Sequence, residues 1–296
     1  MPTPPENPSP TGETVSRQSL ANRTGYDEDF LGLTVPLPLP AQNGVETVTL
    51  PYTHFSVVFR PDRRLAAATG VTIDGAKLIK LGRDDDWQFD PRLPESQQAG
   101  HPVYRDNPLD KGHMVRRLDP VWGNGTEAAT ANADTFYYTN AAPQMDVLNQ
   151  GKKLWLGLED FLLGHAGLFE RKLSVFTGPV LEDSDPAYRG IKVPLRFWKV
   201  TAFMQGGRLA STAYILDQTP DLSRDAADRA LAEAERAGDP PPLGAFRTFQ
   251  VPVADVAEIT RLDLGPLPDA DLLPPGVRAA RRWTRLESYD DIALSQ

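Results

Sequence analysis

The sequence predicts an α+β protein with a mainly antiparallel β-sheet core flanked by helices. Strand-like and helix-like segments are interspersed without strict βα alternation, which favours antiparallel strands with helices packed on the sheet. Hydrophobic residues make up 40% of the 296 residues, a normal share for a packed globular core. The pair Gly206-Gly207 separates two strand-like runs, 197–204 and 209–216, and is typical of a hairpin turn.

The N-terminal part of the chain is expected to lie outside this core. Residues 1–24 are predicted to be a disordered tail because prolines are spread among small polar residues. Residues 25–51 are predicted to be an extended arm, since the Pro-Leu-Pro-Leu-Pro run at 36–40 fits neither a helix nor a central strand. A single domain, 52–296, would then begin near Tyr52.

The remaining elements follow from hydrophobic periodicity and turn signals. A helix is expected over 149–165, where Leu154, Leu158 and Leu162 recur on one face. The polar, alanine-rich segment near 223–240 is predicted to be a surface helix or an insertion that ends at Gly238. The other expected strands are 55–59, 70–73, 77–81, 136–139, 173–181 and 246–253.

Composition excludes several kinds of chemistry. The chain has no cysteine, so disulfides, thiolate metal sites and cysteine nucleophiles are all excluded. The net charge of −9 disagrees with the basic footprint usual for nucleic-acid binding, although a cleft can be locally positive on an acidic protein. We find no signal-peptide pattern and no apolar run long enough for a bilayer. We therefore expect no membrane partner and a cytoplasmic protein, or one exported after processing.

The stretch Asp110-Lys111-Gly112-His113 carries the strongest functional signal. The chain has only four histidines, so a histidine-based mechanism has few candidates. Histidine changes charge near neutral pH and can take a proton from water, while the nearby cations Lys111, Arg116 and Arg117 can hold an anion. This is the local chemistry that activates a water next to a phosphate. Activity that depends on a neutral His113 would fall below about pH 6.5.

Three polar residues downstream of His113 could complete such a site. They are Asn140, Asn149 and Glu159, and their neutral and anionic oxygens suit a hard cation such as Mg²⁺. Each also has a simpler interpretation. Asn149 is a favoured residue for a helix N-cap, and Glu159 taken alone would be an exposed helix charge.

The order of these motifs resembles the DNA/RNA non-specific endonucleases of the ββα-metal superfamily, the endonuclease G-like family. That family shows Asp-Arg-Gly-His, then an Asn-containing strand end, an Asn-Gln helix start and a Leu-Glu pair. The resemblance covers roughly residues 50–265 and includes Phe197-Trp-Lys199. The matching motifs are Asp110–His113, Thr139-Asn140 with Pro143-Gln144, Leu148-Asn149-Gln150 and Leu158-Glu159.

The resemblance implies a ββα-metal finger and metal-dependent hydrolysis of DNA and RNA, leaving 5′-phosphate and 3′-hydroxyl ends. His113 would be the general base, and Asn149 would bind one divalent metal directly, either Mg²⁺ or Mn²⁺. Glu159 would contact the metal through a water, and Asn140 would hold the histidine loop. DNA and RNA are the expected partners, and a homodimer and an inhibitor protein are further expectations.

Two departures from the family pattern qualify this interpretation. Lys111 stands where the family has arginine, and lysine cannot offer the bidentate fork, so we expect reduced transition-state stabilisation. Asn149 and Glu159 are ten positions apart instead of eight, which changes their relative direction on a helix. Glu159 would still point at the metal if Gly151-Lys152 formed a non-helical start.

Several charged and aromatic residues keep two interpretations. Arg116, Arg117 and Arg60 are predicted to bind substrate, but the first two could instead pair with carboxylates such as Asp119. Asp84-Asp85-Asp86 is interpreted as a solvated turn. For the whole chain, the alternative to a nuclease is a catalytically weak nucleic-acid- or partner-binding domain on the nuclease fold. A phosphoesterase with a small substrate is a third option.

Overall fold

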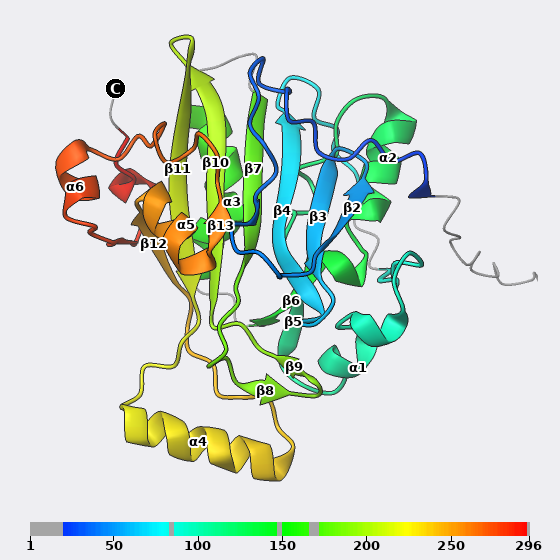
Figure 1. Ribbon diagram of the computed structural model, residues 1–296, viewed down its shortest axis with the longest axis vertical. Coiled ribbons are helices and arrows are strands. Elements are labelled where there is room, and N and C mark those ends of the chain that lie inside the picture. Colours follow the sequence, from blue (N-terminus) through cyan, green and yellow to red (C-terminus); the bar gives the residue numbers. More distant parts are fainter. Residues whose placement is uncertain (1–19, 83–85, 147–149, 166–171, 295–296) are drawn as a thin grey trace, which may run out of the picture.

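An eight-stranded antiparallel sheet forms the centre of the molecule (Figure 1). The computed structural model describes residues 20–82, 86–146, 150–165 and 172–294. The strand order is β14-β12-β11-β10-β7-β4-β3-β2, and every neighbouring pair is antiparallel. The strands are β2 (Val48–Tyr52), β3 (Phe55–Arg60), β4 (Leu65–Asp74), β7 (Lys172–Val180), β10 (Arg196–Gln205), β11 (Arg208–Asp217), β12 (Arg247–Val251) and β14 (Thr284–Leu286). The predicted α+β class is confirmed.

Each face of this sheet is covered by its own hydrophobic core, because its middle strands are apolar on both sides. All ten residues of β4 are buried. Behind the sheet in Figure 1 lies α3 (Gln150–His165), whose residues Leu154, Leu158 and Leu162 are buried as the periodicity predicted. In front lie α5 (Val253–Thr260) and the N-terminal segment, which contribute the second core.

The N-terminal segment packs more closely than the sequence predicted. Leu20 is only 1% exposed although it belongs to the predicted tail, and Val35 of the predicted arm is fully buried. The packed body therefore begins well before Tyr52. Pro51 sits within β2, which is tolerated because β2 is an edge strand and a proline need not donate to a neighbour there.

Two predicted strands do not form. Residues 77–81 make a single bridge, Leu78 with Trp122, and Leu78 is 41% exposed. Residues 136–139 do not form a strand: their three aromatic rings pack against Trp87 and Tyr52 from other segments. A short 3-10 turn covers Tyr138–Asn140, and the strand β6 begins only at Ala141. Aromatic side chains favour strands, but tertiary packing outweighs that preference here, so no strand forms.

The hairpin and the surface helix agree with the sequence. Gly206 and Gly207 have φ of 56° and 77° between β10 and β11, a backbone that glycine adopts without strain. The helix α4 (Arg224–Ala237) has no buried residue, stands away from the sheet in Figure 1 and ends at left-handed Gly238. None of the helices in the described ranges is long and apolar enough to cross a membrane.

The smaller elements surround the sheet. The two-stranded sheets are β1–β13, β5–β6 and β8–β9, each antiparallel. Their bounds are β1 (Leu39–Pro40), β5 (Leu109–His113), β6 (Ala141–Met145), β8 (Ala187–Tyr188), β9 (Ile191–Lys192) and β13 (Leu262–Asp263), and the remaining helices are α1 (His101–Tyr104), α2 (Gly125–Asp134) and α6 (Pro275–Ala279).

Candidate active site

The antiparallel pair β5–β6 lies beside the large sheet, and α3 follows it in the chain, which gives the strand, strand and helix of a ββα unit (Figure 1). His113 is the last residue of β5 and pairs with Ala141, the first residue of β6. The order of strand, strand and helix agrees with the finger that the motifs predicted. His113 is half-buried and faces a hollow of about 640 Å³ beside this unit.

Asn140 ties down the loop that follows His113. Its side-chain oxygen accepts from the Val115 N–H (2.8 Å), and its Nδ2 donates to the carbonyls of Val115 (3.1 Å) and Thr135 (3.0 Å). Its own carbonyl accepts from the Met114 N–H (2.9 Å). Asn140 is completely buried and both ends of its amide bind backbone. These contacts suit a residue that positions the histidine loop and leave its amide little capacity to bind a substrate.

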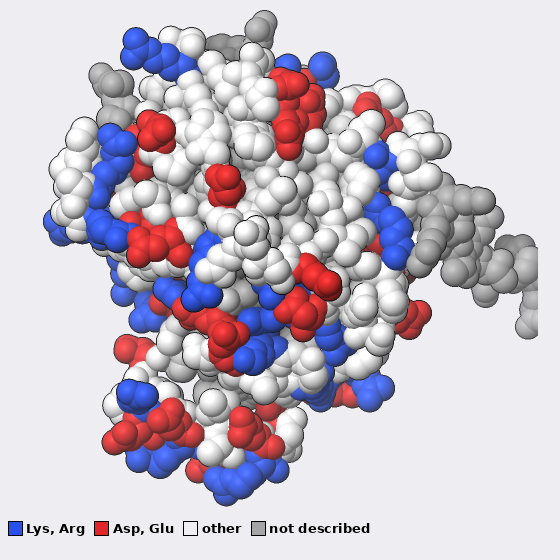
Figure 2. Space-filling view, viewed as in Figure 1, with Lys and Arg blue, Asp and Glu red and all other residues white. Residues whose placement is uncertain are grey.

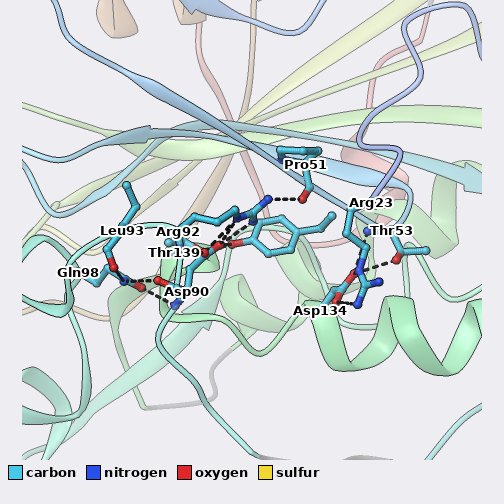
Figure 3. A network of polar contacts seen from close by, with 10 residues as sticks. Arg23, Pro51, Thr53, Asp90, Arg92, Leu93, Gln98, Asp134 and Thr139 are labelled. Atoms are coloured by element: carbon cyan, nitrogen blue, oxygen red, sulfur yellow. Dashed lines mark hydrogen bonds and ion pairs between the residues drawn. The ribbon is translucent and has the colours of Figure 1, made fainter. Parts of the chain in front are cut away.

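A buried polar network supports this region from behind (Figure 3). The Tyr52 hydroxyl donates to Asp90 (2.5 Å) and lies 2.6 Å from the hydroxyl of Thr139, the neighbour of Asn140. Arg92 donates to both carboxylate oxygens of Asp90 (2.6 Å to Oδ2 and 3.0 Å to Oδ1) and to the Pro51 carbonyl (2.8 Å). Burial raises the pKa of Tyr52 well above its usual value, so the tyrosine stays a neutral donor. Edge strand β2 thereby fixes the turn that carries Asn140.

A second part of the same figure shows Asp134 as an anchor between the N-terminal segment and α2. Its carboxylate accepts from Arg23 (2.7 and 3.1 Å) and from both the N–H and the hydroxyl of Thr53. These contacts explain why the last residues of the predicted tail pack against the body.

The hollow beside His113 has an aromatic wall. The Trp87 ring lies 4.7 Å from the His113 ring, and Phe136 meets His113 edge-on at 5.1 Å. The Lys111 ammonium lies 5.6 Å from the centre of the Trp87 ring. Sequence reasoning did not select Trp87, because one tryptophan after an acidic run carries no recognisable motif.

Cationic side chains line much of this hollow, but most of them are paired. Arg116 binds Asp160 through both terminal nitrogens (2.9 and 2.8 Å), and Lys152 donates to Asp110 (3.1 Å). Lys111 has no ion pair among the residues that the structure describes. The full lining is Trp87, Asp110, Lys111, Gly112, His113, Met114, Arg116, Arg117, Gln144, Asp146, Lys152, Trp155, Leu156 and Lys199.

The predicted pairing of Arg116 with carboxylates is present together with its place in the hollow. Burial alone would lower the pKa of Arg116, but Asp160 and Asp119 raise it overall, so the guanidinium stays charged. Arg117 instead donates to the carbonyls of Leu81 and Gly82 and to Asn132. Both arginines therefore reach the hollow while bound to protein groups.

Arg60 does not lie at this site. It lines a separate hollow of about 480 Å³ together with Arg63 and Arg261, and it binds Asp62 through two hydrogen bonds (2.7 and 2.6 Å). The two hollows share no lining residue. β3 carries Arg60 to a different part of the surface from His113. That Arg60 binds substrate stays a prediction.

Glu159 is buried beneath the hollow and not exposed on the helix. It is 1% exposed and pairs with Lys199 of β10, whose ammonium also donates to the Trp155 carbonyl (3.3 Å). Lys199 lines the hollow, whereas Glu159 is absent from its lining. Burial and the charge of Glu159 raise the pKa of nearby Asp119 well above its ordinary value. Sequence reasoning missed Lys199 as a site residue, although a lysine within an apolar strand is a usable signal.

The donor chemistry fits a hard cation that keeps most of its water ligands. The second carboxylate oxygen of Glu159 is buried without a hydrogen-bond partner in the described part of the chain, and Asp146 and Gln144 add oxygens at the hollow. Within those same residues no cluster of three or more His, Cys, Asp or Glu could hold a metal. Asn149, the predicted direct ligand, lies outside the described residues, immediately before α3.

The helix start differs from the one that the spacing argument required. Gly151 and Lys152 are helical, because α3 begins at Gln150.

The Asp84-Asp85 part of the acidic run lies outside the described residues, while Asp86 is exposed and accepts from Gln88 (2.8 Å). On the face shown in Figure 2, acidic and basic side chains lie interspersed below the sheet and over α4.

The fold and the site formed beside β5, β6 and α3 define a protein of the ββα-metal nuclease class. Residues 39–271 match the model of the DNA/RNA non-specific endonuclease family. The chain therefore belongs to this family.

Two relatives are similar to this chain over part of their length. The protein y4fB of Sinorhizobium fredii is 40% identical over 272 residues, which cover 85% of this chain and 40% of that protein. Mitochondrial endonuclease G of Homo sapiens is 26% identical over 151 residues, 47% of this chain and 48% of the human protein. The chain thus spans less than half the length of these relatives.

A solved structure shares the fold. A chain in the crystal structure of the EndoG/EndoGI complex, which concerns the mechanism of EndoG inhibition, superposes with a TM-score of 0.51 at 18% identity. The match covers 73% of this chain and 84% of that chain. The antiparallel sheet with its flanking helices is therefore the architecture of endonuclease G.

Proposed function

We propose that this chain is a metal-dependent endonuclease that hydrolyses phosphodiester bonds of both DNA and RNA. The observation that carries the proposal is the position of His113, at the end of β5 in a hollow that also contains Lys111, Arg116 and Lys199. A base and several cations around one hollow suit a substrate that is anionic and must be attacked by water. Family membership supports the same activity.

In this reaction His113 removes a proton from a water molecule as the water oxygen bonds to phosphorus. The bond from phosphorus to the 3′ oxygen breaks, and that oxygen takes a proton from a solvent water, so that 5′-phosphate and 3′-hydroxyl ends form. His113 then releases its own proton to solvent. Lys111 holds a phosphate oxygen by its charge, and Asn140 keeps His113 in place through the backbone of Val115.

A divalent cation, Mg²⁺ or Mn²⁺, would supply electrostatic stabilisation of the phosphate oxygens and of the leaving oxygen. Asn149 would hold it directly. Gly151 and Lys152 are helical, so Glu159 lacks the orientation that a contact with the same ion was expected to need. Glu159 binds Lys199 instead and thereby holds that ammonium at the hollow. The possibility of an inhibitor protein is part of the proposal, since the EndoG of the superposed structure is found in a complex that inhibits it.

Digestion of supercoiled plasmid and of ribosomal RNA by the purified chain tests this function. We expect cleavage of both polymers with Mg²⁺ or Mn²⁺ and none with a chelator. Lack of cleavage with every divalent metal tried would reject the proposal. Salt-sensitive binding without turnover would favour the binding-domain alternative, and hydrolysis of model diesters alone would indicate a phosphoesterase with a small substrate.

A further inference from the structure

Gln144 lies on β6 in the wall of the His113 hollow, and its side chain crosses the neighbouring strand at Gly112. An added Cβ on Gly112 would come within 2.2 Å of Gln144 Cδ and 2.5 Å of Oε1. Any larger residue at 112 would therefore displace this carboxamide. The glycine of the Gly-His pair leaves room for the amide of a residue more than thirty positions later in the chain.

The carboxamide of Gln144 is buried without satisfying its donor. Gln144 is 5% exposed, and its Nε2 has no hydrogen-bond partner among the residues that the structure describes. A buried amide donor normally finds a partner, and one that lacks it costs folding free energy. Its cross-strand neighbour Asp110 binds Lys152 instead (3.1 Å). Stability of the fold therefore does not explain why a glutamine occupies position 144.

Gln98 shows what a structural glutamine looks like in the same molecule. It is fully buried, its oxygen accepts from the Asp90 N–H (2.9 Å), and its nitrogen donates to the carbonyls of Asp90 (2.9 Å) and Leu93 (3.2 Å) (Figure 3). Both ends of the Gln98 amide are therefore bound to backbone groups of the fold. Gln144 lines the hollow that contains Lys111 and His113, and its Nε2, although buried, is bound to none of the described residues.

We infer that Gln144 binds substrate: its amide N–H donates to a phosphate oxygen of the nucleic-acid backbone in the hollow. Phosphate oxygens only accept, so they match the unpartnered donor, and a neutral donor adds to the charge that Lys111 supplies. This inference rests on the proposed nuclease function and assigns one more residue to it.

Replacement of Gln144 by methionine, which has similar length and no hydrogen-bonding amide, tests the inference. We expect Gln144→Met to lower kcat/KM on plasmid and on an oligonucleotide about 10- to 100-fold. Its melting temperature should equal or exceed that of the wild type, because an unsatisfied buried group is removed. Gln144→Glu should be less active still, since its carboxylate repels phosphate. Gln98→Met serves as the matched control and should lower the melting temperature.

The outcomes separate the two proposals. If the wild type cleaves and Gln144→Met cleaves equally well, the inference is wrong and the nuclease function stands. A melting temperature lowered as in Gln98→Met would make Gln144 a structural residue, which also overturns it. If the wild type does not cleave, the proposed function fails. Fluorescence anisotropy with a labelled single-stranded oligonucleotide and a chelator then decides: about tenfold weaker binding by Gln144→Met supports the contact, and equal binding rejects it.

Discussion

The hollow lined by His113 and the hollow lined by Arg60 both contain several cationic side chains, but they use them differently. Around Arg60, the guanidinium groups serve the fold: Arg60 binds Asp62, and Arg63 donates to the Glu182 carbonyl (2.9 Å) and to Asp185 (3.2 Å). Around His113, Lys111 has no ion pair and Gln144 no partner for its donor within the described residues. The number of cations in a hollow therefore says less about binding than the groups to which they are already bound.

The largest difference between the two hollows should appear in catalysis. We expect His113→Ala to lose about 10²- to 10⁴-fold in kcat, the range that general-base catalysis contributes. Arg60→Ala should stay within about twofold of the wild type, because that arginine is bound to Asp62 and lies outside the site. Initial rates on plasmid with Mg²⁺ measure both variants. A large loss for Arg60→Ala would show that the second hollow also binds substrate.

Lys111 should give the next largest effect. Lys111→Ala is expected to lower kcat/KM about 10- to 100-fold, the usual range for loss of a hydrogen bond to a charged group. Lys111→Arg should equal or exceed the wild type, because arginine offers a bidentate fork to phosphate. Steady-state rates of both variants measure this. If arginine proved as damaging as alanine, the ammonium would have a role that is specific to lysine.

The smallest effect should be one of stability, at Asp185, which accepts from Arg63 of the other hollow. Burial raises the pKa of Asp185 to about 6, although Arg63 opposes the shift. The folded carboxyl then keeps its proton at pH values where the unfolded one, with a pKa near 3.8, has lost it. Its contribution is therefore most favourable below pH 4 and is lost as the pH rises through about 6.

Comparison of the wild type with Asp185→Asn isolates this group, because asparagine does not titrate. From pH 4.5 to 7 the wild type should lose about 1–2 kcal/mol of unfolding free energy relative to the variant. Urea unfolding at several pH values provides the measurement. A difference that stays constant with pH would mean that Asp185 remains ionised in the fold throughout.

Local signals in the sequence predicted the regular elements well. The glycine pair at Gly206-Gly207 and the leucine stripe of α3 each depend on nearby residues, so both were predictable. The predicted strand over 136–139 failed, because its rings pack with Trp87 and other aromatic residues from distant segments. The N-terminal segment was misjudged for the same reason: its prolines are visible locally, but the surface that buries Leu20 is not.

The features of the candidate site also differ in whether they depend on nearby residues or on residues distant in the sequence. The sequence by itself determined the order of motifs, the family and the histidine, because these lie in short contiguous stretches such as Asp110–His113. The tertiary structure decided which polar groups are committed to the fold. Arg116 meets Asp160 and Glu159 meets Lys199 across 44 and 40 positions of the chain. The interaction energy of two charges depends on the distance between them. For residues so far apart in sequence, only the fold sets that distance.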